Sequence, residues 1–284
     1  MAGFFGFFDY TKPGPGIPKD APPKHPVIVF FEIYSRKFWN LVKLNILFSI
    51  FNLPAIATMA FLVIISQMSF SSVAGDDLLM DFVLRFILGS FLLCIPLVTV
   101  GPAQAGFTFV LRNYAREEHA FIWSDFKEHA LKNFKESVII SVIDLIVAII
   151  IAIDLRIYMT MQKGNFLITI ASAMLVLSFI IYLMMHMYIY PMLVTFKLGI
   201  KQIYKNALIF AVIRFLPNLG ILVLCAAVLM ASFIYPFIGM MLFPLITVST
   251  IGLITNFYVY PALKKHIIDR VRLDNAEGSD EGQA

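Results

Sequence analysis

Charged side chains are rare in the long apolar stretches of this 284-residue sequence, so the few that occur there are the first candidates for chemistry. Asp144 and Arg214 lie inside two such stretches and are 70 residues apart. A buried charge is costly unless it is paired, so one hypothesis is that these two side chains form an ion pair. The alternative is that each lies near one end of its stretch and extends its charged group to water.

The same spacing of 70 residues relates His186 to Asn256. These two side chains either line a polar seam between apolar helices or satisfy backbone groups close to them. A proton relay through such a seam would need more polar neighbours than the sequence indicates. The candidate polar seam therefore consists of four residues: Asp144, His186, Arg214 and Asn256.

Residue types that serve in catalysis are present, but their spacing does not favour an enzyme. Glu117, Glu118 and His119 are adjacent, whereas two metal ligands on one helix face need a spacing of three or four residues. No Gly-rich phosphate-binding loop occurs, and no Ser, His and Asp residues are arranged as a catalytic triad. We therefore expect a non-enzymatic protein without catalytic residues, cofactor or metal site.

The most polar stretch is the segment 111–126, in which charges of both signs alternate with aromatic residues. On a helix, Arg112 and Arg116 would share one face, as would Asn113 and Glu117. Such a surface could dock a protein partner, or it could be a cap that holds the chain's own helices together, and the sequence favours neither. The candidate docking residues are Arg112, Asn113, Arg116, Glu117, Glu118, His119, Trp123 and Asp125.

The elements that must position these residues are membrane-spanning helices. The chain is 60% hydrophobic and only 14% charged, whereas soluble domains are about 25% charged. This composition argues against a soluble enzyme, a disordered chain and a disulfide-rich secreted module. A span needs about 20 apolar residues. The sequence predicts an all-α fold with six spans, near 44–65, 82–109, 138–153 and 166–194, and two within 208–263 that are separated by a turn near Tyr235 and Pro236.

The distribution of basic residues predicts the orientation of these spans. With both termini in the cytoplasm, 18 of the 22 Lys and Arg residues fall on the cytoplasmic side. This agrees with the rule that inner loops are positively charged. The net charge of +4 is accordingly interpreted as contact with anionic membrane lipids and not with nucleic acid.

A repeat is visible in the second half of the chain, where a Tyr-x-Tyr-Pro motif begins at Tyr188 and again at Tyr258. We expect three tandem helical hairpins, at about 28–115, 124–195 and 197–263, each introduced by an amphipathic elbow helix at the inner interface. Ser124 is the expected N-cap of the second elbow helix, which would present Phe126 and Phe134 on one face. The alternative is that short aromatic-proline matches arise by chance in a chain with 28 Phe residues.

The two ends of the chain differ from this six-span membrane domain, which we place at 28–272. Residues 1–27 are rich in Pro and Gly and are expected to be a cytoplasmic segment. Residues 273–284 are acidic and contain Gly and Ser, a composition typical of disorder.

Several motifs resemble the YesL family of bacterial integral membrane proteins. They are the segment 13–17 with Lys19 and Asp20, the segments 31–33, 36–39 and 44–45, and the segments 101–103, 105–106 and 111–126. The resemblance covers roughly residues 10–135. It implies a multi-pass protein of the cell membrane of mainly Gram-positive bacteria, with members often encoded beside sugar-importing ABC transporter parts. It implies no catalytic residues, because the family has no established biochemical activity.

Three functions stay open at this point. The first is a non-enzymatic accessory or regulatory subunit of a carbohydrate ABC importer, whose segment 112–126 contacts the permease or its ATPase. The second is a stand-alone carrier or channel for small solutes, built around the candidate polar seam. The third is a structural or lipid-organising protein, and the oligomeric state is left open.

Overall fold

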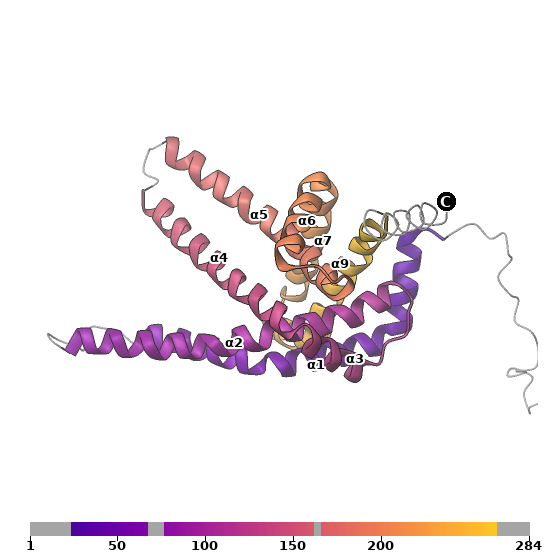
Figure 1. The fold of residues 1–284 in the computed structure, drawn as a ribbon, viewed down its shortest axis with the longest axis horizontal. Coiled ribbons are helices and arrows are strands. Elements are labelled where there is room, and N and C mark those ends of the chain that lie inside the picture. Colours follow the sequence, from indigo (N-terminus) through magenta and orange to yellow (C-terminus); the bar gives the residue numbers. More distant parts are fainter. Residues whose placement is uncertain (1–23, 68–76, 162–165, 266–284) are drawn as a thin grey trace, which may run out of the picture. The chain divides into compact units, whose positions relative to one another are not determined.

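The computed structural model describes residues 24–67, 77–161 and 166–265, and within these ranges the chain is helical and contains no strand (Figure 1). An all-α fold is therefore confirmed for this part of the chain. The elements in chain order are α1 (Pro26–Gln67), α2 (Asp77–Ala115), α3 (Ile122–Lys132), α4 (Phe134–Met161), α5 (Phe166–Thr195), α6 (Ile200–Ile213), α7 (Phe215–Ser232), α8 (Pro236–Leu242), the π-helix η2 (Phe243–Thr247) and α9 (Val248–Leu263).

The chain divides into two units, residues 1–36 and 37–284. In the first unit, the described residues comprise the start of α1. There the Nζ of Lys24 forms an ion pair with the carboxylate of Glu32, and the ring of Phe30 packs edge-on against Phe31. The second unit contains the remainder of the fold and all of the predicted site residues.

Six helical segments among the described residues are long and apolar enough to cross a bilayer, as the sequence predicts. The predicted split of the last apolar stretch is also confirmed. α7 ends at Ser232, and α8 begins at Pro236 with extended backbone at Tyr235. Proline suits the first turn of a helix because the backbone N–H that it lacks would have no partner there.

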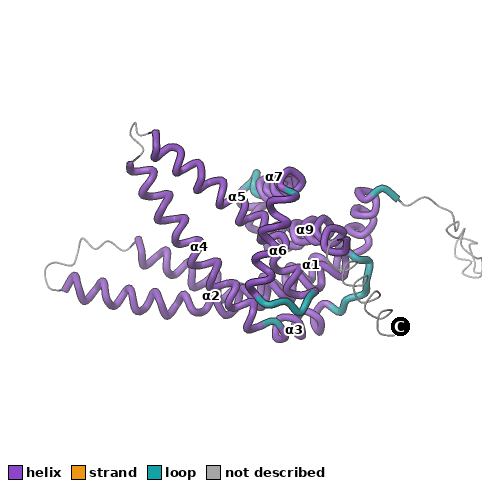
Figure 2. The backbone as a smooth tube through the Cα atoms, turned by 45° about the horizontal axis from the view of Figure 1, so that its top comes forward, coloured by secondary structure: helices purple, strands orange, loops and turns teal. Residues whose placement is uncertain are grey.

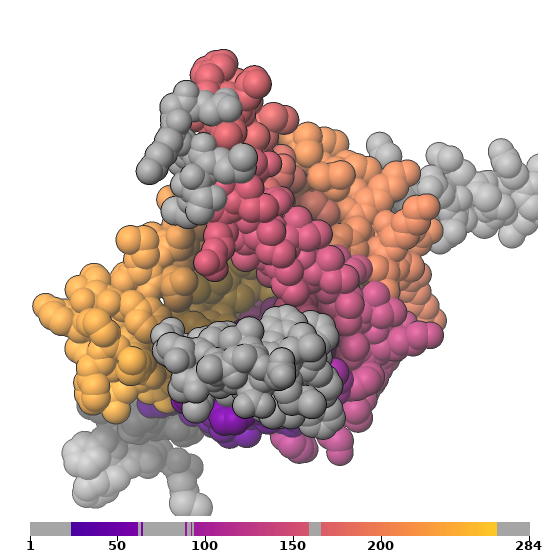
Figure 3. Space-filling view, turned by 90° about the vertical axis from the view of Figure 1, so that its left-hand side faces the viewer, coloured from indigo at the N-terminus to yellow at the C-terminus, as the bar shows by residue number. Residues whose placement is uncertain are grey.

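Within the second unit, α2 packs against α3, α4, α5 and α9 (Figure 2). The hydrophobic core gathers at the C-terminal half of α5, where Tyr188, Ile189 and Met192 are fully buried. Residues of α6 and α9, among them Ile203 and Val259, complete this core. In the space-filling view, the surface is hollowed between the α4–α5 pair and the helices that follow Pro236 (Figure 3).

The second elbow helix differs in detail from the prediction. α3 begins at Ile122, and Ser124 lies exposed in its first turn without capping it. Instead, the Oδ2 of Asp125 accepts a hydrogen bond of 2.8 Å from the backbone N–H of Phe121. Phe126 is buried, as expected for the apolar face, but Phe134 belongs to α4 because the helix is interrupted at Asn133. The predicted Ser124 cap is therefore wrong.

A short π-helix, η2, separates α8 from α9 and is held by a side chain of α1. The Nδ2 of the fully buried Asn45 donates to the carbonyl oxygen of Phe243 (2.7 Å). Its Oδ1 accepts from the backbone N–H of Ser249 (2.7 Å). Asn45 thus binds both ends of the π-helix and satisfies backbone groups that the irregular geometry frees.

Two predicted segments fall largely or wholly outside the described residues. They are the Pro/Gly-rich N-terminal segment, of which residues 1–23 are not described, and the acidic tail at 273–284. The arrangement as three tandem hairpins and the location of the elbow helices at a membrane interface stay predictions.

Candidate functional site

Asp144, in the middle of α4, is the centre of a polar cluster with two residues of α5. Its Oδ1 lies 2.9 Å from the Nε2 of His186 and accepts a hydrogen bond of 2.5 Å from the hydroxyl of Tyr182. The His186 side chain is 26% exposed and that of Asp144 is 30% exposed. A carboxylate in a spanning helix requires such partners, because lipid offers it no hydrogen bonds.

The predicted ion pair between Asp144 and Arg214 does not form. Arg214 lies between α6 and α7, and its guanidinium carbon is 4.9 Å from the centre of the Tyr258 ring. Asp144 is almost three turns inside α4. A spacing of 70 residues therefore relates a helix interior to a helix junction, so these residues are not at equivalent positions.

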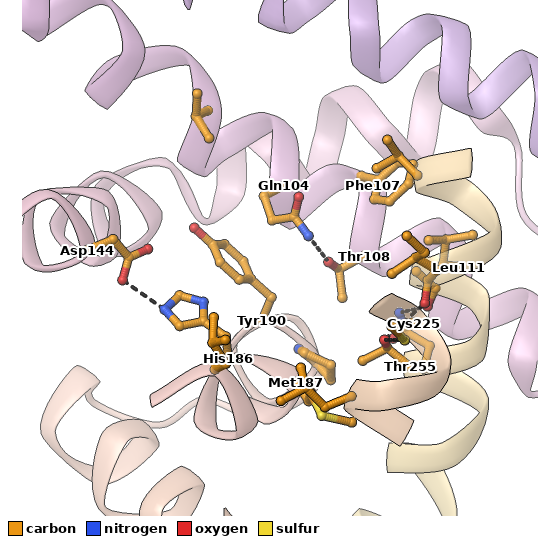
Figure 4. Close-up of a pocket in the computed structure, with 18 residues that line it drawn as sticks. Gln104, Phe107, Thr108, Leu111, Asp144, His186, Met187, Tyr190, Cys225 and Thr255 are labelled. Carbon is orange, nitrogen blue, oxygen red and sulfur yellow. Dashed lines mark hydrogen bonds and ion pairs between the residues drawn. The ribbon is translucent and has the colours of Figure 1, made fainter. Parts of the chain in front are cut away.

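Three of the four predicted seam residues nevertheless line one cavity of about 410 Å³, here called the seam cavity. Asp144 and His186 lie on one side, and residues of α2, α7 and α9 lie on the other (Figure 4). The polar and sulfur-bearing side chains that line it are Gln104, Thr108, Asp144, His186, Met187, Tyr190, Cys225, Thr255 and Asn256.

Asn256 leaves one hydrogen-bonding group without a protein partner at this cavity. Its Nδ2 donates to the backbone oxygen of Gly252 (2.8 Å). Asn256 therefore satisfies a nearby backbone group, which is one of the two roles that the sequence suggested. Its buried Oδ1 has no partner within the described part of the chain. Because an unpaired buried acceptor costs about 1–3 kcal/mol, a donor from a bound molecule or water would be favoured here.

Sequence reasoning missed several residues of this site. Tyr182 and Tyr190 lie four residues before and after the predicted His186, which places three polar rings on one face of the apolar helix α5. Gln104 and Thr108 have the same spacing on α2, where the amide of Gln104 and the hydroxyl of Thr108 lie 3.5 Å apart. This periodicity is the sequence signal that could have identified them.

The candidate docking segment is partly a cap for the chain's own helices. Arg112 donates to the backbone oxygen of Val194 (2.9 Å) and to the hydroxyl of Thr195 (3.2 Å) at the end of α5. It also donates to the Oδ1 of the buried Asn113 (2.9 Å). Arg116 forms an ion pair with Glu118 (2.8 Å). These contacts favour the cap interpretation for the first part of the segment.

The second part of the segment presents side chains outward. Phe121 is 67% exposed and Trp123 is 57% exposed, and Glu117, Glu118 and His119 are also exposed. Glu117 adopts a φ of 59°, the left-handed conformation that ends α2 and turns the chain outward. The structure therefore separates the predicted surface into an internal half at 112–116 and an exposed half at 117–123.

A third pair of residues at the 70-residue spacing, Tyr188 and Tyr258, meets at Asn218. The hydroxyls of Tyr188 and Tyr258 both donate to the Oδ1 of Asn218, over 2.6 and 2.7 Å. The Nδ2 of Asn218 donates to the backbone oxygens of Phe210 and Ala211, near the end of α6. Asn218 thus joins α5, α6, α7 and α9 at one buried point, which we call the tyrosine clasp.

Within residues 24–67, 77–161 and 166–265, no three His, Cys, Asp or Glu side chains are grouped as metal ligands would be. Residues 41–155 match the model of a family described as "Protein of unknown function, DUF624". The matched residues cover the second half of α1, all of α2 and α3, and most of α4. For this part of the chain, the match supports similarity to a family of unknown function. No curated protein and no solved structure matches the chain.

Proposed function

We propose that this protein is a multi-pass membrane protein that binds a small polar solute in the seam cavity and moves it across the bilayer. The observation that carries this proposal is the convergence of Asp144, His186 and Asn256 on one cavity between spanning helices. Its volume of about 410 Å³ lies within the range of small-molecule sites. We place the protein in a bacterial cell membrane with both termini in the cytoplasm, without enzymatic activity.

The lining indicates the class of solute. Hydroxyl, amide and imidazole groups offer several hydrogen bonds, and a single carboxylate is shared with His186 and Tyr182. Phe107, Leu111 and Met187 provide apolar contacts beside them. Alternating polar groups and apolar surface suit an uncharged solute with several hydroxyl groups, such as a sugar or polyol.

Uptake by liposomes that contain only this protein tests the proposal. A panel of radiolabelled monosaccharides, disaccharides and polyols is offered, and wild type is expected to accumulate at least one of them. Asp144→Asn is expected to lower that uptake by about ten-fold or more, since a hydrogen bond to a charged group contributes about 1.5–3 kcal/mol.

Asp154→Asn is the matched control, because Asp154 lies on the same helix but does not line the seam cavity. Its uptake should equal that of wild type. Equal uptake by Asp144→Asn and wild type would contradict the proposal.

A second candidate is the accessory role beside a carbohydrate ABC importer. It is supported by the exposed aromatic residues Phe121 and Trp123 next to the charged Glu118 and His119, since aromatic residues are enriched in protein interfaces. In this case the protein alone gives no uptake, and a permease or its ATPase co-purifies with it from native membranes. Phe121→Ala with Trp123→Ala should then abolish that co-purification.

A further inference from the structure

A second cavity, of about 490 Å³, lies where α3 meets α4 and where α5 is connected to α6. We call it the basic pocket. His129, Lys132 and Asn133 line it from the end of α3, and Glu136 lines it from the first turn of α4. The end of α5 and the connection to α6 form the rest of the wall, which includes Thr195 and Lys197.

Positive charge exceeds negative charge around this pocket. Lys132 and Lys197 are exposed and have no ion-pair partner within the described residues. Arg112 adds a third cation, since its guanidinium binds the backbone oxygen of Val194 and the hydroxyl of Thr195, both of which line the pocket. Glu136 contributes the one carboxylate of the lining, so the two lysines of the lining and the adjacent Arg112 outnumber it.

Two further features of the lining suit an anion that accepts hydrogen bonds. Burial lowers the pKa of His129, an effect to which Lys132 and Arg112 add and which Glu128 and Asp125 oppose. The imidazole is therefore neutral at pH 7 and keeps one N–H donor. The N-cap of α6, Gly199, also lines the pocket, and the positive end of that helix dipole begins there.

The position of the pocket along the spanning helices indicates which kind of ligand can bind there. α4 begins at Phe134 and α5 ends at Thr195, so the pocket lies at the shared end of two candidate spans. Leu193, Phe196 and Leu198 form the apolar part of its wall. A charged group that binds here is therefore next to apolar surface, as a phospholipid headgroup is next to its acyl chains.

We propose that the basic pocket binds the phosphate of an anionic phospholipid, with Lys132 and Lys197 as its charged contacts. Free phosphate has the same charged group, but it would gain nothing from the apolar side chains of Phe196 and Leu198 in the wall. Cationic pockets at the ends of spanning helices can select anionic headgroups in this way. The proposal is independent of the solute site, because the two cavities share no lining residue.

Native mass spectrometry of the purified protein in detergent measures this binding directly. Phosphatidylglycerol and phosphatidylcholine with identical acyl chains are the probes, since they differ in net charge. Wild type is expected to bind phosphatidylglycerol at least ten-fold more tightly. The double variant Lys132→Gln with Lys197→Gln is expected to lose that preference, because each basic residue near a headgroup contributes several-fold to the affinity.

The control is Lys135→Gln with Lys201→Gln, which removes the same charge from exposed positions on α4 and α6 outside the pocket. It should keep the preference within two-fold. Equal losses in the two double variants would show non-specific charge attraction and overturn the proposal, as would the lack of any preference in wild type. Displacement of the lipid by millimolar inorganic phosphate would also overturn it, in favour of a free-phosphate site. The single variants at Lys132 and Lys197 repeat the measurement with smaller changes to the fold.

Discussion

Asn218, in α7, forms hydrogen bonds that connect this helix to α5, α6 and α9. Its Oδ1 accepts both hydroxyls of the tyrosine clasp, and the Asn218 side chain is fully buried. When one of the two hydroxyl donors is removed, the Oδ1 still accepts a hydrogen bond from the other. The oxygen becomes unpaired only when both donors are removed. Stability at this point is therefore expected to be non-additive.

The variants Tyr188→Phe and Tyr258→Phe, made singly and together, test how the tyrosine clasp contributes to stability. Each single variant should lower the free energy of unfolding by about 1 kcal/mol, the usual value of one hydrogen bond. The double variant should lose about 1–2 kcal/mol more than the sum, because the buried Oδ1 is then unpaired. Thermal unfolding of the four proteins in detergent measures this, and simple additivity would show that the hydroxyls act independently.

The sequence predicted Asp144, His186 and Asn256, which line one cavity, but it offered only Arg214 or water as the contact of Asp144. Charge and spacing alone suggested Arg214, whereas the contact of a carboxylate depends on how its helix is rotated against its neighbour. Tyr182 and His186 lie four residues apart on α5, so both face the same side of α4 and contact Asp144. Residue type thus predicted which side chains line the cavity, whereas their contacts depend on how the helices pack.

At the scale of elements, α3 is held to α2 at a position where no side chain fits. A Cβ on Gly106 would overlap the backbone oxygen of Phe126, and it would lie 3.2 Å from the Phe126 ring. A backbone atom cannot move aside without shifting the whole elbow helix. The close approach of α2 and α3 therefore requires glycine here.

Gly106→Ala is accordingly expected to destabilise the protein by about 1–3 kcal/mol, the usual cost of overpacking. The matched control is Gly220→Ala in α7, where a Cβ would meet nothing within 4 Å. That substitution should be neutral or stabilising by up to about 1 kcal/mol, because alanine is the better helix former. The melting temperature should therefore fall for Gly106→Ala and stay unchanged or rise for Gly220→Ala, and equal shifts would refute the packing argument.

The helices themselves could be predicted well because hydropathy and length are properties of the sequence. All six apolar segments and the break before Pro236 follow from them. The start of α3 could not be predicted in this way, since Ser124 and Asp125 are both good capping residues. In the structure, the backbone N–H of Phe121 donates to Asp125. The backbone conformation at the start of α3, which packs against α2, places Asp125 within reach of this group.

At the scale of the whole molecule, the distribution of basic residues predicts that both termini lie on one side of the membrane. In a variant without Cys94 and Cys225, single cysteines at Lys24 and at Lys265 should react equally with a membrane-impermeant maleimide, and only when the cytoplasmic face is open. A cysteine at Lys163 should react from the opposite face. Labelling of the first two positions from different faces would rule out an even number of spans.

The π-helix between α8 and α9 also has a consequence for how this protein can diverge from its relatives. A π-helix corresponds to one extra residue that is accommodated within a single turn, so the α-helix after it keeps its orientation. Loss of a single residue from 243–247 would convert this turn to a regular α-helix and remove the backbone groups that Asn45 binds, while Thr255 and Asn256 would still line the seam cavity. Homologous chains can therefore differ by one residue at this point and keep the same side chains at the cavity, whereas a single deletion from the regular helix α9 would rotate the residues after it by about 100°.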